Sequence, residues 1–417
     1  MRPPGGSRLS VRPTARGWQM IFFGLLITVV ARLIGTTQFY QLAYALLAFL
    51  VVAFVLGLLG SRAIGFSRSL PAGVRFTAGS SARVDLLLSN GSGFDTPEIV
   101  VTDRLPNPET FEAPALRSRG GDVVEVPVSF PRRGIYELGP ARVRATDPFG
   151  FLQFIRPFRG RTEVVVYPPV HDLSGLSLGT GNVEAGARGS LGQRGDEFAG
   201  LREYRRGDDR RHIHWKSLAR TGELYVKEFA LQDPRRFTVA LDLRRQGLRV
   251  PEKEVEDAVS AAASMLAQLG KGGLPSRLIC TDWEGSATEF GSDEKSYWKA
   301  MRLLATVRAN GARDLGVSVL EERGRLGEGV ALVSRTINDD LVQTTRRLRS
   351  AGLSVIVVAV ATHTYRPGSH GRESGRDHEA GFLRDLGRLE TAGAEVCVVR
   401  NSGGVAGLAA SRGRMTI

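Results

Sequence analysis

The chain has 417 residues, 42% of them hydrophobic and 24% charged, which allows two or three folded domains and excludes wholesale disorder. Fifty-six Lys and Arg residues against 43 Asp and Glu residues give a formal charge of +13, which favours anionic partners such as nucleic acid or acidic lipid headgroups. Cys280 and Cys397 are the two cysteines, which excludes a disulfide framework, a Cys-rich metal site and a CxxC redox centre.

Two uncharged apolar runs follow a basic tail at residues 1–17. Residues 39–60 alone are long enough to cross a hydrocarbon core of ~30 Å at 1.5 Å per residue. Residues 18–31 are too short, and this first helix reaches that length only if Arg32 belongs to its last turns and extends its guanidinium to the headgroups. We therefore expect a two-helix transmembrane hairpin over residues 18–60.

The orientation of this hairpin follows from its charges. Arginines lie before and after it, whereas the turn at residues 35–38 is uncharged. The positive-inside rule then places both ends in the cytoplasm of a multi-pass protein of the cell membrane, with the soluble domains on the same side. A cleaved signal peptide that uses residues 18–31 as its apolar region is the alternative.

Residues 65–170 contain short runs in which apolar residues alternate with polar ones, as at Val124, Val126 and Val128. This period of two is typical of strands with one buried face. Such runs lie at residues 83–90, 98–105, 123–130, 141–147 and 162–168. Because Gly, Pro, Asn and Asp separate them, we expect an Ig-like antiparallel β-sandwich, followed by a Gly-rich linker at residues 171–194.

The pattern changes again in residues 235–417. Near-continuous apolar runs lie at residues 237–243, 277–281, 330–334, 353–361 and 394–399, and helical spacing appears at residues 255–269, 297–307 and 339–348. This alternation predicts an α/β doubly wound parallel sheet, whose ligands would lie at the carboxyl ends of the strands.

Asp242 follows the first of these strands. A dinucleotide-binding fold would have GxGxxG here, and the metal loop of the von Willebrand factor type A fold would have Asp-x-Ser-x-Ser. Arg244 and Gln246 replace the two serines. Because a guanidinium repels a cation, we expect a degenerate site at Asp242 that holds no metal.

Three histidines, His363, His370 and His378, lie in or beside a polar stretch at residues 362–377. The composition favours a solvated loop after the fourth strand. Metal collection by the three histidines is the alternative.

The most distinctive stretch is a charged segment at residues 195–234, in which large apolar residues such as Phe198, Trp215 and Phe229 interrupt dense charge. Three interpretations remain open. The segment is an ion-pair network that docks two domains, a surface for a protein partner, or a metal or catalytic site. The last would use His212, His214, Asp208 and Asp209.

This charged segment resembles the signature of the domain of unknown function 58 family. The family pattern has Glu-Phe, Leu-Arg-Glu-Tyr, Gly-Asp-Asp-x-Arg-x-Ile-His-Trp-Lys, Ala-Arg and Val-Lys-Glu. The polar and aromatic residues that match it, and that we take as site residues, are Glu197, Arg202, Glu203, Tyr204, Asp208, Asp209, Arg211, His214, Trp215, Lys216, Arg220, Lys227 and Glu228.

The resemblance extends to the flanking regions. The family is similar in its amino-terminal membrane hairpin, in a β-rich region with an Asp-Pro-Phe-Gly turn (residues 147–150 here), and in its type A-like domain. Members are often encoded near MoxR-type AAA+ ATPases and transglutaminase-like membrane proteins. The resemblance therefore implies a membrane-bound adaptor for such an ATPase.

The leading hypothesis is thus a non-enzymatic, membrane-anchored interaction protein without a cofactor. The sequence has no GxSxG elbow and no HExxH pair. A metal-dependent enzyme built on the His/Asp cluster and a basic nucleic-acid-binding protein are the alternatives, the second on the charge of +13 alone.

Overall fold

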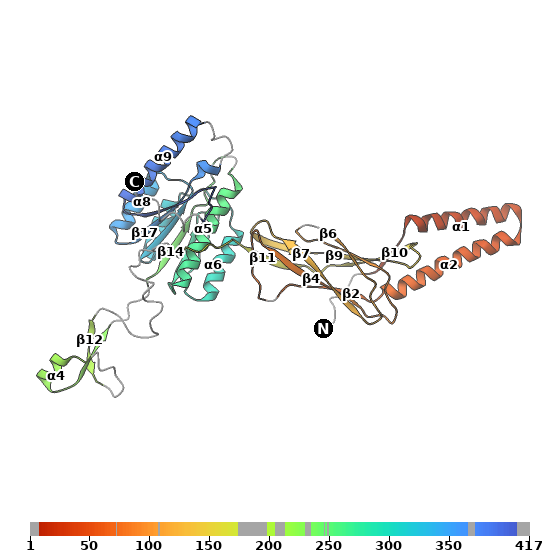
Figure 1. Cartoon of the computed structure of the whole chain (residues 1–417), viewed down its shortest axis with the longest axis horizontal. Helices are drawn as coiled ribbons and strands as arrows, with labels where there is room; N and C mark the ends of the chain where they lie inside the picture. Colours follow the sequence, from red (N-terminus) through yellow and green to blue (C-terminus); the bar gives the residue numbers. More distant parts are fainter. Residues whose placement is uncertain are drawn as a thin grey trace. The chain divides into compact units, whose positions relative to one another are not determined.

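The computed structural model describes residues 8–71, 73–106, 109–173, 198–204, 213–229, 235–245, 247, 250–365 and 372–406 (Figure 1). The chain divides into two compact units, Met1–Tyr167 and Pro168–Ile417.

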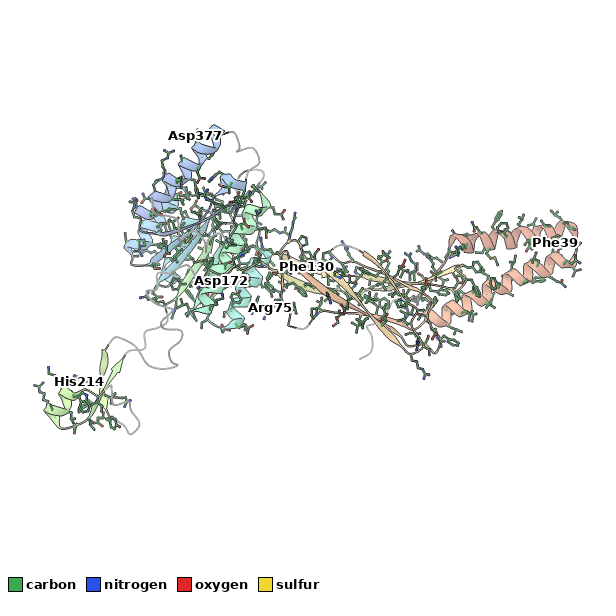
Figure 2. All side chains as sticks on the ribbon, in the orientation of Figure 1. Phe39, Arg75, Phe130, Asp172, His214 and Asp377 are labelled. Atoms are coloured by element: carbon green, nitrogen blue, oxygen red, sulfur yellow. The ribbon has the colours of Figure 1, made fainter. Side chains whose placement is uncertain are left out.

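An antiparallel helix pair opens the first unit, made of α1 (Ala15–Ile34) and α2 (Thr37–Ser61). The side chain of Thr14 caps α1 by accepting the Gly17 N–H at 3.0 Å, and Gly35 ends it with a φ of 75°. Both helices are long and apolar enough to cross a bilayer, with mean hydropathies of 1.8 and 2.8. The helical hairpin is therefore confirmed, with Phe39 at its tip (Figure 2).

The β domain of this unit contains eleven described strands in three sheets. They are β1 (Ser10–Pro13), β2 (Ile64–Ser69), β3 (Phe76–Thr77), β4 (Ser81–Asn90), β5 (Ile99–Asp103), β6 (Glu109–Ala113), β7 (Gly121–Ser129), β8 (Gly134–Leu138), β9 (Ala141–Thr146), β10 (Leu152–Phe158) and β11 (Thr162–Tyr167). The sheet orders are β1-β10-β9-β5-β6, β2-β4-β7 and β3-β11-β8. Every pairing in these sheets is antiparallel except that of β3 with β11, which is parallel. The sequence predicted an entirely antiparallel sandwich and did not indicate this parallel pair.

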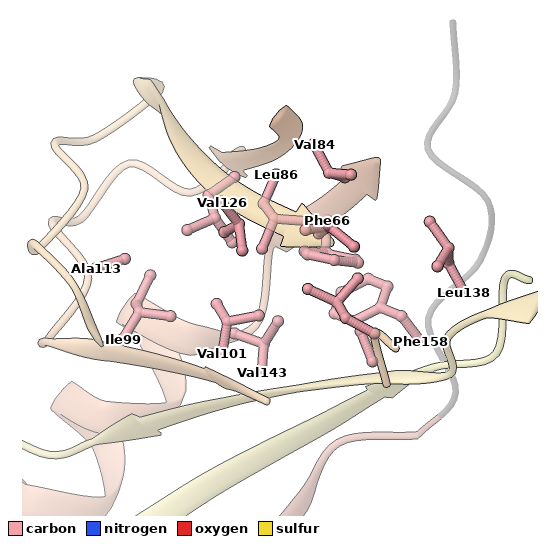
Figure 3. Close-up of a cluster of buried hydrophobic side chains, with 14 of the residues drawn as sticks. Phe66, Val84, Leu86, Ile99, Val101, Ala113, Val126, Leu138, Val143 and Phe158 are labelled. Atoms are coloured by element: carbon pink, nitrogen blue, oxygen red, sulfur yellow. The ribbon is translucent and has the colours of Figure 1, made fainter. Parts of the chain in front are cut away.

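The core of the β domain follows from the alternation of its strands. Along β9, for example, Ala141, Val143 and Ala145 are buried and the residues between them are not. Side chains of all three sheets meet in one cluster, in which Leu86 comes from β4 and Val101 from β5 (Figure 3).

The strand β1 lies within the residues that the sequence analysis assigned to a basic tail. It forms the edge of the five-stranded sheet, with Ser10 opposite Ile155 and Pro13 opposite Leu152. No alternating apolar pattern marks these four residues, because an edge strand that precedes the helices buries little of its surface.

The second unit contains a parallel sheet, as predicted. Its strands are β14 (Phe237–Leu241), β15 (Ser276–Cys280), β16 (Gly329–Ser334), β17 (Ser354–Val360) and β18 (Glu395–Val399), in the order β15-β14-β16-β17-β18. The helices are α5 (Glu252–Lys271), α6 (Glu294–Thr306), α7 (Leu315–Glu321), α8 (Asp339–Ser350) and α9 (Arg372–Thr391), with 3₁₀ turns η2 (Arg323–Arg325) and η3 (Thr362–Tyr365). Figure 1 shows α5 and α6 on one face of the sheet and α8 and α9 on the other.

The expected polar loop at residues 362–377 is wrong at both ends. Its first residues form η3, and α9 begins at Arg372. The helix is anchored farther along, where Leu386 and Leu389 are buried at helical spacing. The polar composition of its first turns therefore concealed a helix that its later turns stabilise.

The charged segment contributes a small module to the second unit. The module consists of β12 (Phe198–Glu203), α4 (Trp215–Thr221) and β13 (Tyr225–Phe229).

Candidate interaction site

Backbone hydrogen bonds hold the module of β12, α4 and β13 together. β12 pairs antiparallel with β13, so that Glu203 lies opposite Tyr225. On the other side of β13, Ile213 forms a bridge with Val226, and the His214 N–H donates to the Tyr225 carbonyl at 2.8 Å. Gly222 ends α4 in the left-handed conformation, with a φ of 78°. The backbone hydrogen bond of His214 therefore fixes the start of the short helix to β13.

The apolar residues of the module do not all anchor it. Ile213 and Val226 are buried, at 7% and 5% exposure. Trp215, the first residue of α4, is 63% exposed, and Leu201 and Leu224 are each 39% exposed. These three side chains therefore do not anchor the module on a core of the described residues. An exposed indole on a fixed helix is typical of a binding surface.

The charged and polar side chains near Trp215 are accessible or locally bonded. Lys216 and Arg220 on α4 and Glu203 on β12 are exposed. His214 Nδ1 lies 2.8 Å from Ser217 Oγ, a local contact at the start of α4. The Tyr225 hydroxyl donates to Glu223 at 3.0 Å, and this hydrogen bond raises the pKa of Tyr225. Arg202 and Tyr204 are half-buried on or beside β12.

Several predicted site residues lie outside the described part of the chain. They are Glu197, Asp208, Asp209, Arg211 and His212. Lys227 and Glu228 belong to β13, but their side chains are also outside it. The His/Asp metal cluster proposed from the sequence therefore stays a prediction.

A second set of polar groups lies at the carboxyl ends of β14 and β16, where the strand order reverses and doubly wound sheets bind ligands. Asp242, after β14, is 2% exposed, and its carboxylate accepts the N–H of Arg244 at 3.0 Å and that of Arg335 at 3.4 Å. Arg335, after β16, is fully buried and donates from Nε to Glu254 at 2.9 Å and from Nη1 to the Arg244 carbonyl at 3.1 Å. Burial raises the pKa of Asp242, and the Arg244 N–H and the Arg335 charge oppose that shift.

These residues do not fit the divalent cation of a type A domain. Hard cations need several oxygen ligands, and here a buried guanidinium contacts the carboxylate of Glu254. Arg244 adds a second cation, which pairs with Asp314 at 2.7 Å. We found no group of three or more His, Cys, Asp or Glu able to hold a metal within the described residues. Arg335 directly follows the apolar run at residues 330–334, and the sequence analysis considered the residues after the first and fourth runs but not this position.

A cleft of about 510 Å³ opens beside this site, at the ends of β16 and β17. On one wall, His363 Nε2 lies 2.7 Å from Glu379, which also receives two hydrogen bonds from Arg400 at 2.7 and 3.1 Å. The hydrogen bond from Arg400 is the main cause of a lowered pKa of Glu379. His363 therefore has a fixed partner, and it is not part of a mobile loop. His370 lies outside the described residues.

Trp283, which the sequence analysis did not consider, is the most exposed large apolar residue among those that the structure describes outside the hairpin, at 76%. It lies in the loop after β15, and its backbone N–H donates to Asn310 Oδ1 at 3.1 Å. It provides a reference indole far along the chain from the module.

A protein-family model and one curated protein match the part of the chain that contains most of the signature. Residues 200–366 match the family model described as protein of unknown function DUF58. The uncharacterized protein YeaD of Bacillus subtilis (strain 168) is 25% identical over 329 residues, which cover 74% of this chain and 79% of YeaD.

Solved structures add little. The CARDB domain of a Pyrococcus furiosus protein, in complex with di-metal ions, matches 25% of this chain and 86% of its own, at 11% identity and a TM-score of 0.19. A GH20 exo-β-N-acetylglucosaminidase from Vibrio harveyi matches 80% of this chain and 75% of its own, at 9% identity and a TM-score of 0.20. Such low TM-scores carry no argument about fold or function. The match to the DUF58 model over residues 200–366 confirms the family resemblance that the signature residues indicated.

Proposed function

We propose that this chain is a membrane-anchored, non-enzymatic interaction protein that presents the module of β12, α4 and β13 to a protein partner. The partner is a MoxR-type AAA+ ATPase, with a transglutaminase-like membrane protein as a second candidate, and the role is chaperone-like or in complex assembly. The exposure of Trp215 on a short helix fixed by backbone hydrogen bonds supports this proposal.

The energetic reason concerns the indole. A tryptophan carries 150–250 Å² of surface, and tryptophan is among the side chains enriched at binding hot spots, where truncation costs about 2 kcal/mol or more. Trp215 is held before any partner arrives, because the hydrogen bond of His214 to β13 fixes the start of its helix. Exposed Lys216 and Arg220 lie on the same short helix and would attract an acidic partner.

The anchor is the hairpin of α1 and α2. Its exposed side chains are apolar for most of its length, and they include Phe22 at 61% and Leu33 at 80% exposure. A bilayer would remove this surface from water. The arginines that flank the hairpin favour a cytoplasmic location for the soluble domains.

The finer fold assignments are part of the same proposal. We assign the β domain to Ig-like sandwiches and the parallel sheet to von Willebrand factor type A-like domains. Residues 286–291 support the second assignment, because they bridge antiparallel to β15 at Ile279 and Ser276 and so add an antiparallel edge to the parallel sheet.

Binding of the purified ATPase to the detergent-solubilised full chain tests the proposal. We expect Trp215→Ala to weaken binding about thirtyfold, which corresponds to ~2 kcal/mol, and to leave the melting temperature unchanged. Trp283→Ala is the matched control, because it removes another exposed indole, at 76% against 63% exposure, outside the module. Equal affinities of wild type and Trp215→Ala would refute the role of the module.

A further inference from the structure

The turn between β9 and β10 is a rigid loop that carries aromatic side chains. The buried carboxylate of Asp147 accepts the N–H of Phe149 at 2.9 Å and also the N–H of Leu152. Gly150 supplies a φ of 80°, and its N–H donates to the Asp147 carbonyl at 3.0 Å. The Asp-Pro-Phe-Gly sequence therefore fixes a turn in which Phe149 stays 37% exposed.

This turn is fastened to both helices of the hairpin. The Thr14 hydroxyl donates to the Gly150 carbonyl at 2.6 Å, and the Thr14 N–H donates to the Phe151 carbonyl at 2.8 Å, just before α1 begins. The ring of Phe49, in the middle of α2, lies 4.5 Å from that of Phe149 and 5.6 Å from that of Phe151. The turn therefore lies at the start of α1 and beside the middle of α2.

The rest of α2 packs on the β domain below the turn. The rings of Phe54 and Phe154 lie 6.1 Å apart, and a Cβ on Gly57 would collide with the Phe154 ring. Gly60 approaches the Asp95 carbonyl so closely that a Cβ there would lie 2.9 Å from it. Small residues at these positions allow close contact over the carboxyl-terminal half of α2.

The length of helix that remains clear of the β domain is short. Between Thr37 and Phe49, α2 rises only about 18 Å, and α1 rises about 26 Å from Gly17 to Ile34. A hydrocarbon core is ~30 Å thick. If α2 crosses the bilayer, the residues around Phe49 must lie within the lipid, and the aromatic turn that packs on Phe49 must lie at the same depth.

We infer that the β domain carries a membrane-facing end, made of Phe149, Phe151 and the neighbouring Phe94, which enters the interface of the phospholipid bilayer. Phe94 is 49% exposed, and Phe94, Phe149 and Arg16 line one hollow of about 690 Å³. Aromatic rings are favoured at the level of the headgroups, and an arginine beside them is placed to meet lipid phosphates. The rigid turn thus determines the depth of the β domain relative to the bilayer.

This inference rests on the membrane anchor of the proposed function, so its test must separate the two. Nitroxide labels would be attached to single cysteines in the full chain, reconstituted in phosphatidylcholine–phosphatidylglycerol bilayers, after Cys280→Ala and Cys397→Ala. Phe149→Cys and Phe94→Cys report on the membrane-facing end. Phe22→Cys is the reference for a label inside the lipid. Ile135→Cys is the matched aqueous control, because Ile135 is 46% exposed and lies on β8, the strand before β9, whereas the aromatic turn follows β9.

Collision with oxygen and with a water-soluble nickel chelate gives the depth of each label. We expect the labels at positions 149 and 94 to meet the chelate several-fold less often than the label at 135. Chelate access at 149 and 94 equal to that at 135, with the label at 22 protected, would overturn the membrane-facing end alone. Free chelate access at position 22 as well would overturn the anchor and, with it, the inference. Phe149→Cys removes a ring that packs on α2 and could therefore disturb the turn. Phe94→Cys is the second reporter because, among the described residues, Phe94 makes no aromatic contact with α2.

Discussion

A buried ion pair joins two sheets of the β domain and allows a quantitative prediction. Arg68 on β2 reaches Asp103 on β5 with two hydrogen bonds, from Nε at 2.6 Å and from Nη2 at 2.7 Å. The side chains are 4% and 0% exposed. Arg68 also donates to the Gly160 carbonyl at 3.0 Å. β2 and β5 belong to different sheets, so the pair acts across the core.

Arg68→Ala would leave the Asp103 carboxylate as an uncompensated buried charge. Removal of one partner from such a pair costs about 3–5 kcal/mol. The exposed pair of Arg83 with Glu125, at 78% and 60% exposure, serves as the matched control, because exposed pairs contribute only ~0–1 kcal/mol. We therefore expect a large loss of stability from Arg68→Ala and almost none from Arg83→Ala.

Hydrogen exchange of the full chain in detergent measures the difference within the β domain itself. Amide protection in β4 and β5 should fall by about two to three and a half orders of magnitude in Arg68→Ala, since each 1.4 kcal/mol is a factor of ten. The double variant Arg68→Met with Asp103→Leu should recover much of that protection, because it leaves no charge in the core. Equal protection in Arg68→Ala and Arg83→Ala would refute the reasoning.

Two further predictions concern the α/β domain. Arg335→Ala should destabilise it by about 3–5 kcal/mol, because Glu254, 1% exposed, loses its ion pair with Arg335, and Arg335→Met with Glu254→Leu should restore most of the loss in a thermal melt. A double variant no more stable than the single one would contradict this. For Glu379, the hydrogen bond from Arg400 lowers the pKa, so its contribution to stability is complete above the ordinary glutamate pKa of about 4.3 and is lost as the pH falls through the folded pKa. Glu379→Gln should reduce the loss of stability at acid pH by less than about 1 kcal/mol, because the Glu379 side chain is 33% exposed. A series of thermal melts at different pH values measures this loss, and an identical pH dependence in wild type and variant would contradict the prediction.

Local patterns in the sequence sufficed for most elements of the fold. The alternation in residues 141–147 predicted β9, and the apolar run in residues 353–361 predicted β17, because the period of side chains along a strand depends only on neighbouring residues. The helical hairpin was equally legible from its length and hydropathy. Where the local pattern was polar, as in the first turns of α9, prediction failed because later turns stabilise the helix.

The sites depended on contacts between residues distant in the chain. The signature indicated the family resemblance and marked the charged segment, but the exposure of Trp215 became clear only in the folded module, where β12 pairs with β13 and the indole lies outside. Arg335 meets Glu254 across 81 positions, and Phe49 meets Phe149 because β1 and β10 bring the turn to the helices. Composition and periodicity do not predict such long-range contacts. They depend on the path of the folded chain, which determines which distant side chains lie next to each other.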